Sequence, residues 1–586
     1  MKRALGLFAW LAFAASAAAL DNGALPVPLL GWSTWNLVGN RVNETLLRSM
    51  ADAMVDSGLH RAGWRWIMLD DGWTECLEHT ADGAMCLDHT RGRGADGRLR
   101  PDPSLFPSGM KSTVEYVHKL GLKFGIYTCV SYEQGSLRAL DGHTERPPCT
   151  LPRTQQPPHA SSRIAVSKLT LMLLKHSSSF GDRTCAGYSG SLGHEAVDAA
   201  TFGAWGVDLV KHDYCVCNAS VVLKSAPLMR DALNATGRPI VYVEKRRSLP
   251  CTVCCTVCCT VCCTVCCAVC GAVHAVVCAV ASCCGVLLPR PNTYRCFLSF
   301  FLRYYVDVGG MVPKVAPGAL HSGPGRGPTH AGKVVSRAQD LPWVWGPSTA
   351  NMWKTWHDIG HQATPAAKVY PLSCQWRRIM DNLDHNVGHG QLLASGPNGY
   401  NFPDMLMLGL PGCSPAEERS QYSLWVVQGT PLVASNDLRE LVPGHGHGLT
   451  ASARATLAIL SNGEALAIAQ DPLALPGAKV KDSGSTSVYI KTLAGADPPT
   501  SFAAALLNRG ETEATIELDF CVDLDPFGFC DPSGVPGVLA VRDVWEGKEG
   551  VYSGKIVLNV SAHGTALLTL RLPRDASVGV GSELIG

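Results

Sequence analysis

Short apolar runs, each ending in polar residues, alternate with amphipathic stretches up to about residue 410. The apolar runs span 66–69, 124–126, 207–210 and 239–243, and they end in Asp70 and Asp71, in Tyr127, in Lys211 and Asp213, and in Glu244. Between them, 44–57, 109–120 and 194–204 have helical periodicity. Apolar strands that are each followed by a helix predict an α/β fold whose parallel sheet is covered on both faces.

Polar residues gathered at the carboxyl ends of parallel strands are typical of the active face of a (β/α)8 TIM barrel. A doubly wound open sheet is the alternative arrangement of alternating strands and helices. No Gly-x-Gly-x-x-Gly motif leads from an early strand into a helix, so the pattern gives no sign of a dinucleotide site. We therefore predict the barrel.

The run 207–210 leads directly into Lys211 and Asp213. Because successive side chains of a strand alternate between its faces, Leu209, Lys211 and Asp213 share one face. A cation beside a carboxylate favours the ionised form, which a carboxylate nucleophile needs. By themselves these residues are equally compatible with a surface ion pair at the end of a strand.

After about residue 472 the pattern changes to short alternating runs separated by Gly, Pro and Asp, at 487–490, 502–507, 515–518, 538–541 and 566–570. Such runs are typical of an antiparallel β-sandwich. A chain of 586 residues is long enough for one large domain and a smaller one. We predict a barrel over 24–472, a sandwich over 474–574 and a tail over 575–586.

Two segments interrupt the barrel pattern. In 246–338, 13 of the chain's 25 cysteines lie between Cys251 and Cys284, within a Cys-Thr-Val-Cys repeat that lacks turn or capping residues. We interpret it as a translated nucleotide repeat, such as a retained intron; a thiolate metal cluster and a membrane span are the alternatives. The segment 131–180 is unpatterned and too long for a loop in a compact domain, and a surface insertion is its alternative.

The N-terminus has Lys2 and Arg3 before an apolar run and small residues, which predicts a signal peptide over 1–19 and entry into the secretory pathway. The destination is then extracellular or vacuolar/lysosomal. Possible N-glycosylation sites are Asn43, Asn218, Asn234 and Asn559. In an oxidising compartment, plausible disulfides are Cys185 with Cys215, Cys76 with Cys86, and Cys521 with Cys530, although sequence does not determine connectivity.

The net charge of +1 gives no electrostatic reason to expect nucleic acid or an anionic membrane as a partner. We expect a neutral or locally recognised substrate and no membrane span. A homodimer is one candidate assembly.

Collinear motifs extend over nearly the whole chain outside the two segments: Gly31-Trp-Ser-Thr-Trp35-Asn, Leu69-Asp-Asp-Gly-Trp73, Pro101 to Gly109, Lys123 to Tyr127, Cys185-Ala-Gly-Tyr, Gly193-His-Glu, Trp205 to Cys215, Trp353 to Ile359, Pro403-Asp404-Met-Leu, Gly429 to Arg439 and Gln470-Asp-Pro472. With these motifs the chain resembles the glycoside hydrolase family 27 enzymes, the α-galactosidases and α-N-acetylgalactosaminidases. Agreement in this order is more specific than any single motif.

The resemblance implies a retaining glycosidase with Asp213 as nucleophile and Asp358 as general acid/base, the two carboxylates ~5 Å apart. It implies that Asp213 is kept ionised beside Lys211, while Asp358 stays protonated until it donates. It also implies a disulfide between Cys185 and Cys215, and neither a metal ion nor an organic cofactor.

The sugar-binding residues implied by the resemblance are Trp35, Asp70, Asp71, Tyr127, Lys211, Lys354 and Asp404. Carboxylates suit this task because each accepts hydrogen bonds from two hydroxyls, while aromatic faces cover the C–H surface of a sugar. Taken singly, the aspartates are equally typical of capping or surface pairing, and the aromatic residues of an ordinary core.

The chain departs from the family pattern at Gly72, Lys354 and Phe402, where the family usually has a cysteine, an arginine and an acid. The loop that reads the C2 substituent of the sugar is interrupted after Lys245, so the sequence does not show whether the sugar is galactose or N-acetylgalactosamine.

We expect an α-galactosidase. The alternatives are an α-N-acetylgalactosaminidase and a galactose-binding homologue that is impaired by the insertions. Metal storage by the cysteine repeat is a third class.

Overall fold

The computed structural model describes residues 22–130, 183–215, 219–245, 342–360, 370–387, 394–444, 448–495, 501–524 and 537–573. Eight parallel strands form one sheet in the order β10-β1-β2-β5-β6-β7-β8-β9. They are β1 (Leu30–Ser33), β2 (Trp66–Leu69), β5 (Lys123–Val130), β6 (Leu209–Tyr214), β7 (Val241–Lys245), β8 (Met352–Lys354), β9 (Tyr400–Phe402) and β10 (Leu432–Ala434).

From β1 to β9 each of these strands pairs with the next one along the chain, and β10 pairs with β1, as in a (β/α)8 barrel. The two ends of the sheet are joined after β9, where the amide of Leu406 donates to the carbonyl of Val433 at 2.8 Å. The predicted TIM barrel is therefore confirmed, and the open doubly wound sheet is not what the chain adopts.

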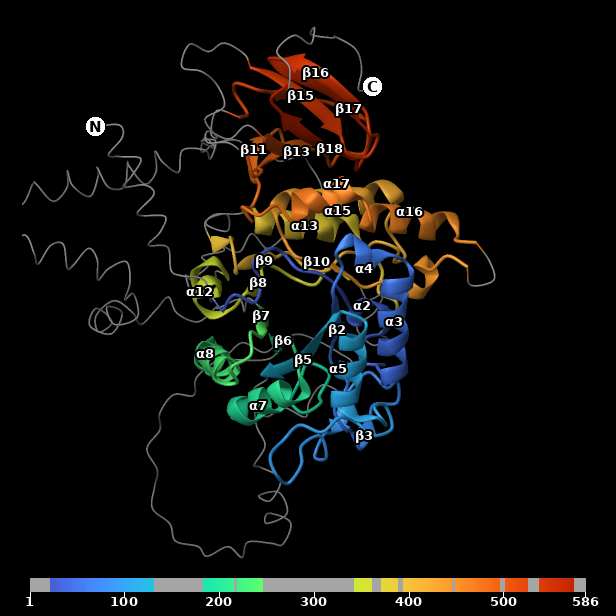
Figure 1. Ribbon diagram of the computed structural model, residues 1–586, viewed down its shortest axis with the longest axis vertical. Helices are drawn as coiled ribbons and strands as arrows, with labels where there is room; N and C mark the ends of the chain where they lie inside the picture. The colour runs from blue at the N-terminus through green and yellow to red at the C-terminus, as the bar shows by residue number, and fades with distance from the viewer. Residues whose placement is uncertain are drawn as a thin grey trace, which may run out of the picture. The chain divides into compact units, whose positions relative to one another are not determined.

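The barrel helices lie beside these strands (Figure 1). Before β8 they are α2 (Trp35–Val38), α3 (Glu44–Asp56), α4 (Leu59–Ala62), α5 (Gly109–Lys119), α7 (Glu195–Trp205), α8 (Ala219–Ala235) and α12 (Pro342–Thr349). After it come α13 (Trp376–Asn386), α15 (Pro415–Gln428), the short 3-10 helix η2 (Leu438–Leu441), α16 (Ala451–Leu460) and α17 (Gly463–Ala469), and a small hairpin joins β3 (Glu78–His79) to β4 (Cys86–Asp88).

Of the three helices and four strands whose bounds were predicted in the barrel, α3, α5, α7, β2 and β7 lie within two residues of those bounds. The strand predicted at 207–210 differs, because β6 starts at Leu209 and continues through Lys211 and Asp213 to Tyr214. The extension follows from β5, whose Cys129 and Val130 still pair with Asp213 and Tyr214. The polar residues therefore belong to the strand itself.

Alternation along the strands separates two apolar cores. Inward side chains such as Met68, Leu209 and Val433 pack in the barrel interior, whereas Ile67, Val210 and Leu432 pack against the helices outside. Because a strand covered on both faces buries every side chain, these runs are apolar without interruption until the polar residues begin.

The predicted β-sandwich is confirmed as well. One antiparallel sheet contains β11 (Ala478–Asp482), β12 (Thr486–Thr492), β13 (Ser501–Asn508), β18 (Thr565–Arg571), β15 (Val538–Asp543) and β16 (Glu549–Ser553), and a second contains β14 (Ala514–Asp519) and β17 (Lys555–Val560). Alternate residues such as Ile490, Leu506 and Ile516 form the core between the sheets.

Helix α15 joins the two domains into one apolar core. It contacts β12, β13 and β18, and its residues Tyr422 and Trp425 belong to the same cluster as Tyr489 and Leu567 of the sandwich. The helix begins with a capping box, in which Ser414 accepts from the amide of Glu417 and the Glu417 carboxylate accepts from that of Ser414.

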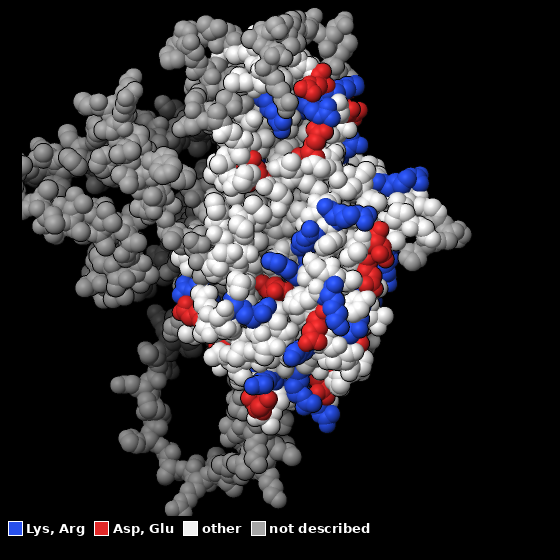
Figure 2. Space-filling view, in the orientation of Figure 1, with Lys and Arg blue, Asp and Glu red and all other residues white. Residues whose placement is uncertain are grey.

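Charges are intermixed on the surface. In Figure 2, Lys and Arg lie among Asp and Glu over the described part of the face shown, in keeping with the net charge of +1. None of the helices within the described ranges has the length and apolar character needed to cross a membrane.

Several predictions fall outside the described residues. They are the signal peptide 1–19, the tail, and the whole of the segments 131–180 and 246–338. The pair Cys521–Cys530 includes Cys530, which also lies outside them, whereas Cys76 and Cys86 form the predicted disulfide.

Lys491 places a buried amine between the sandwich and the barrel. Its Nζ donates to the carbonyl of Ile468 in α17 at 2.8 Å. Burial lowers the pKa of Lys491 to about 8, although the nearby carboxylate of Asp471 opposes this shift.

We expect the free energy of unfolding to rise by roughly 3 kcal/mol between about pH 8 and pH 10.5. In this range Lys491 has lost its proton in the folded protein but still holds it in the unfolded chain. Below pH 8 both states hold that proton and the contribution is constant. Lys491→Met should remove the rise in urea unfolding measured across this range, whereas Lys555→Met, at an exposed lysine, should keep it. An equal rise in the wild type and Lys491→Met would contradict the prediction.

Candidate active site

One cavity of about 230 Å³ opens within the barrel. It is lined by eight of the nine side chains to which the sequence assigned catalysis or sugar binding: Trp35, Asp70, Tyr127, Lys211, Asp213, Lys354, Asp358 and Asp404. They come from β5, β6, β8 and the segments that follow β1, β2, β8 and β9. The carboxyl ends of the strands thus bring together residues that are up to 369 positions apart in the chain, Trp35 and Asp404.

Asp213 lies on β6 and is 2 % exposed. Its Oδ1 accepts a hydrogen bond from the amide of Tyr214 at 2.8 Å. Its Oδ2 accepts one from the hydroxyl of Tyr127 at 3.4 Å. Burial, and then the Asp213 carboxylate, hold the pKa of Tyr127 well above its ordinary value, so this hydroxyl remains a donor.

Lys211 forms an ion pair with Asp70, since its Nζ lies 2.6 Å from Oδ2 of Asp70. The same Nζ is 5.1 Å from the centre of the Tyr127 ring. Lys211 and Asp213 share the inner face of β6 as predicted, and both line the cavity. The expected role of Lys211 in keeping Asp213 ionised stays a prediction.

Asp71 is the predicted binding residue that is not among the lining residues. It is 1 % exposed and accepts hydrogen bonds from the amides of Gly72 and Ala186, both at 2.8 Å. Burial raises its pKa to about 7, against the effect of these hydrogen bonds and one from Thr184. Asp71 therefore holds the loop that contains Cys185, and does so from behind the cavity wall.

Gly72, where the family usually has a cysteine, has a φ of +104°, which favours glycine. A Cβ at this position would lie 2.4 Å from the carbonyl oxygen of Asn40. Glycine at position 72 therefore allows the backbone next to Asp71 to approach the backbone of Asn40 closely.

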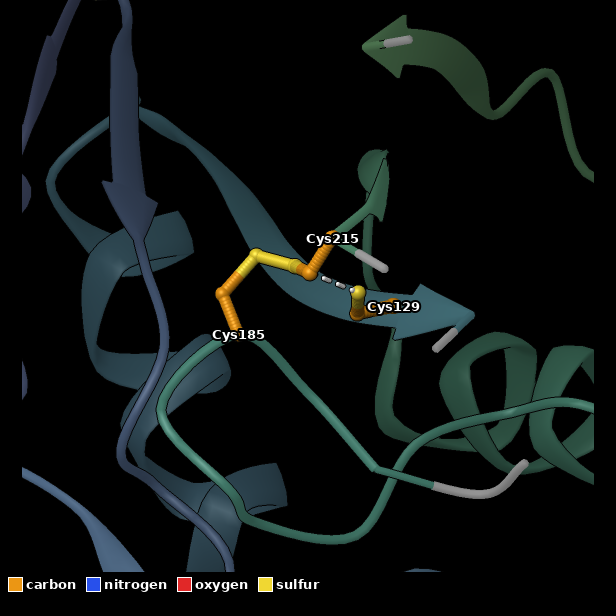
Figure 3. Close-up of side chains that lie close together, drawn as sticks. All are labelled: Cys129, Cys185 and Cys215. Carbon is orange, nitrogen blue, oxygen red and sulfur yellow. Dashed lines mark hydrogen bonds between the residues drawn. A yellow bond between two sulfur atoms is a disulfide. The ribbon is translucent and has the colours of Figure 1, made fainter. Parts of the chain in front are cut away.

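The disulfide between Cys185 and Cys215 is present, as the resemblance implied. It joins the 183–191 loop to the end of β6, two residues beyond Asp213 (Figure 3). The hydroxyl of Tyr127 donates to Sγ of Cys185 at 3.1 Å. A further disulfide between Cys374 and Cys413 was not predicted, since spacing alone does not single it out among the remaining cysteines.

Lys354 lies between two carboxylates. Its Nζ pairs with Asp358 four residues later and is 2.9 Å from Oδ1 of Asp404. Asp404 has a φ of +91°, a left-handed conformation that costs free energy in a residue with a side chain. It is held by the amide of Ile359, which donates to its Oδ2 at 2.7 Å, and by Trp425, whose Nε1 donates to its carbonyl at 2.9 Å.

We expect Lys354→Met to lower the free energy of unfolding by about 3–5 kcal/mol, because Asp404, 3 % exposed, would lose its buried cation. Lys354→Arg should lower the free energy of unfolding less, since arginine keeps the positive charge. Urea unfolding measures both. The matched control is Lys479→Met, which removes a more exposed pair with Asp482 and should cost about 1 kcal/mol or less. A cost for Lys354→Met as small as that of the control would count against the buried pair.

Glu244 was not assigned to the site, yet it lines the cavity and is fully buried at the end of β7. The signal that identified Asp70, a carboxylate directly after an apolar strand, was present here too. Asn36, Phe402 and Met405 also line the cavity. A second cavity shares Asp358 with the first and is lined by Trp356, His357, Gln375, Arg377, Arg378, Asp381 and Asn382.

The comparisons with known proteins agree with this architecture. The family model described as "Alpha galactosidase A" matches residues 36–141, 158–253 and 343–471, and the "Alpha galactosidase C-terminal beta sandwich domain" matches 483–570. The first match omits 142–157 and 254–342, which lie largely within the two segments that interrupt the barrel pattern.

Relatives align over nearly the whole chain. A probable α-galactosidase of Dictyostelium discoideum is 27% identical over 97% of this chain and 99% of its own. α-Galactosidase A of Cellvibrio japonicus is 25% identical over 93% and 91%. The crystal structure of α-galactosidase I from Mortierella vinacea shares the fold with a TM-score of 0.59 and 22% identity, covering 95% of this chain and 100% of that one. Because the family model spans more than half of the sequence, the chain belongs to the α-galactosidase A, or melibiase, family of glycoside hydrolases.

Proposed function

We propose that the protein hydrolyses terminal α-linked galactose from oligosaccharides, glycolipids or glycoproteins by double displacement. Asp213 attacks the anomeric carbon, and Asp358 protonates the departing oxygen. The observation that supports this best is that both carboxylates line one cavity together with the ion pairs Lys211–Asp70 and Lys354–Asp404. Family membership supports the same reaction class.

The two carboxylates have environments suited to different roles. Asp213 is buried and accepts hydrogen bonds from the amide of Tyr214 and the hydroxyl of Tyr127, which hold its carboxylate in place for attack. The side chain of Asp358 is 39% exposed and lies between the two cavities. After the covalent glycosyl intermediate forms on Asp213, the deprotonated Asp358 takes a proton from water, which releases the sugar with its original configuration.

Sugar hydroxyls would bind the carboxylates of Asp70 and Asp404 and the amines of Lys211 and Lys354. Each of these ions is already paired with another residue of the cavity lining, so the pocket is preorganised. Trp35 and Tyr127 supply the apolar wall. The leaving group would lie in the second cavity, because Asp358, which protonates it, lines both cavities.

We also propose that the secreted enzyme consists of the barrel and the sandwich, without the signal peptide 1–19 and without 131–180 and 246–338. The omission of parts of both segments from the family match supports this. Reading the transcript across both junctions tests it: transcripts that encode both segments in full would overturn the proposal.

The proposed reaction is tested by proton NMR, which follows the hydrolysis of nitrophenyl α-galactoside in a buffer without methanol. We expect α-galactose as the first product, before mutarotation, because two inversions at the anomeric carbon give net retention. First appearance of β-galactose would exclude the double displacement. Faster turnover of the α-N-acetylgalactosaminide would favour the alternative substrate, and galactose binding by calorimetry without turnover would identify an impaired homologue.

A further inference from the structure

A thiol lies against the disulfide that ends β6. Cys129 carries this thiol, and its Sγ is 3.1 Å from Sγ of Cys215, which is bonded to Cys185. Figure 3 shows the contact as a dashed line between Cys129 and Cys215, whose sulfur is also bonded to that of Cys185. Thiol–disulfide exchange requires a thiolate to reach one sulfur of a disulfide.

Little movement separates this contact from a bond. A disulfide bond is about 2.05 Å long, so Sγ of Cys129 has to approach Cys215 by roughly 1 Å. Cys129 is fully buried on β5, where its backbone pairs with Asp213 of β6. Two groups held together in this way react as if at a very high local concentration, without a thiol from solution.

We propose that Cys129, Cys185 and Cys215 form an exchange site, in which the disulfide alternates between Cys185–Cys215 and Cys129–Cys215. Cys129 loses its proton and attacks Sγ of Cys215. The bond between Cys215 and Cys185 breaks, and Cys185 leaves as a thiolate that takes up one proton. One thiol and one disulfide are present before and after, so the step needs neither an oxidant nor a reductant.

The two pairings restrain different parts of the cavity wall. In the observed pairing, the 183–191 loop is tied to β6, and Cys185 lines the cavity and accepts the hydrogen bond from Tyr127. The other pairing ties β5 to β6 instead and leaves the loop held by its hydrogen bond to Asp71. Since the single hydrogen of the Tyr127 hydroxyl lies within reach of both Cys185 and Asp213, exchange changes the surroundings of that carboxylate. Only this effect on turnover rests on the proposed function.

Peptide mapping of the full-length protein tests the pairing. The protein is incubated at mildly alkaline pH without reductant, quenched with acid, unfolded, labelled with N-ethylmaleimide and digested. We expect both linked peptides, with labelled Cys129 and labelled Cys185 in complementary amounts. Labelling of Cys185 should fall about tenfold or more in Cys129→Ser, which removes the attacking thiol. A wild type that contains Cys185–Cys215 alone would overturn the proposal, as would equal labelling of Cys185 in both proteins.

Locked variants test the consequence for the site. In Cys185→Ser we expect Cys215 linked to Cys129 and a kcat/KM for nitrophenyl α-galactoside about tenfold or more below that of Cys129→Ser. Equal kcat/KM would overturn the effect on the site. If Cys185→Ser does not fold, the wild-type map still decides. A wild type without α-galactosidase activity would refute the proposed function, while the peptide map would still decide the exchange.

Discussion

Asp213→Asn reduces kcat/KM for nitrophenyl α-galactoside at least about 1,000-fold, because the amide lacks the negative charge that attacks the anomeric carbon. The amide oxygen can still accept from the amide of Tyr214, so the protein should unfold at nearly the same temperature. Nitrophenol release and thermal unfolding measure the two quantities. Asp96→Asn, at an exposed carboxylate, is the matched control and should keep full activity.

A small external nucleophile shows whether Asp213 attacks the sugar or only supports the structure of the site. Asp213→Gly leaves space for azide on the face that the carboxylate occupied, and azide should restore turnover and give the β-galactosyl azide. Activity of Asp213→Asn close to that of the wild type would remove Asp213 from the mechanism. Formation of the α-azide would reassign it as the acid/base.

Asp358→Gly loses activity in a manner that depends on the leaving group. For a poor leaving group such as methanol, loss of the general acid should reduce kcat/KM about 100- to 10,000-fold. For galactosyl fluoride, which needs little protonation, formation of the covalent intermediate should be almost unchanged. Steady-state kinetics on the two substrates measures the difference, and azide should now give the α-galactosyl azide, since it attacks the intermediate on Asp213.

The matched control is Asp381→Gly. Asp381 lines the same second cavity as Asp358 and is exposed, so its loss should affect methyl galactoside and galactosyl fluoride equally. An equal loss on both substrates for Asp358→Gly as well would show that Asp358 positions the substrate and transfers no proton.

The sequence predicted the barrel well because its strands are buried on both faces. Their uninterrupted apolar runs and the polar residues after them are local features, and they located Asp70, Tyr127 and Asp213 without any tertiary information. The same pattern included Glu244, although the site assignment left it out. Helix α15 has little amphipathic pattern, since barrel and sandwich bury it from two sides.

The local sequence pattern could not predict which residue pairs with each charged side chain. Lys211 was expected beside Asp213, yet its ion pair is with Asp70, which lies 141 positions earlier on the chain. Asp71 was grouped with Asp70 as a sugar ligand, but its carboxylate turns to the amide of Ala186 behind the cavity wall. Adjacent residues at a strand end face opposite ways, and only the closed sheet shows which one faces the interior.

By itself the sequence determined the element types, the two domains and the carboxylates at the strand ends, because periodicity and motif order are properties of neighbouring residues. The tertiary structure alone decided that Lys354 lies between Asp358 and Asp404, that Glu244 joins the cavity, and that the thiol of Cys129 touches the disulfide beside Asp213. Apart from the pair of Lys354 and Asp358, which are four residues apart, these contacts join segments that are distant along the chain, and the closed sheet brings their side chains together.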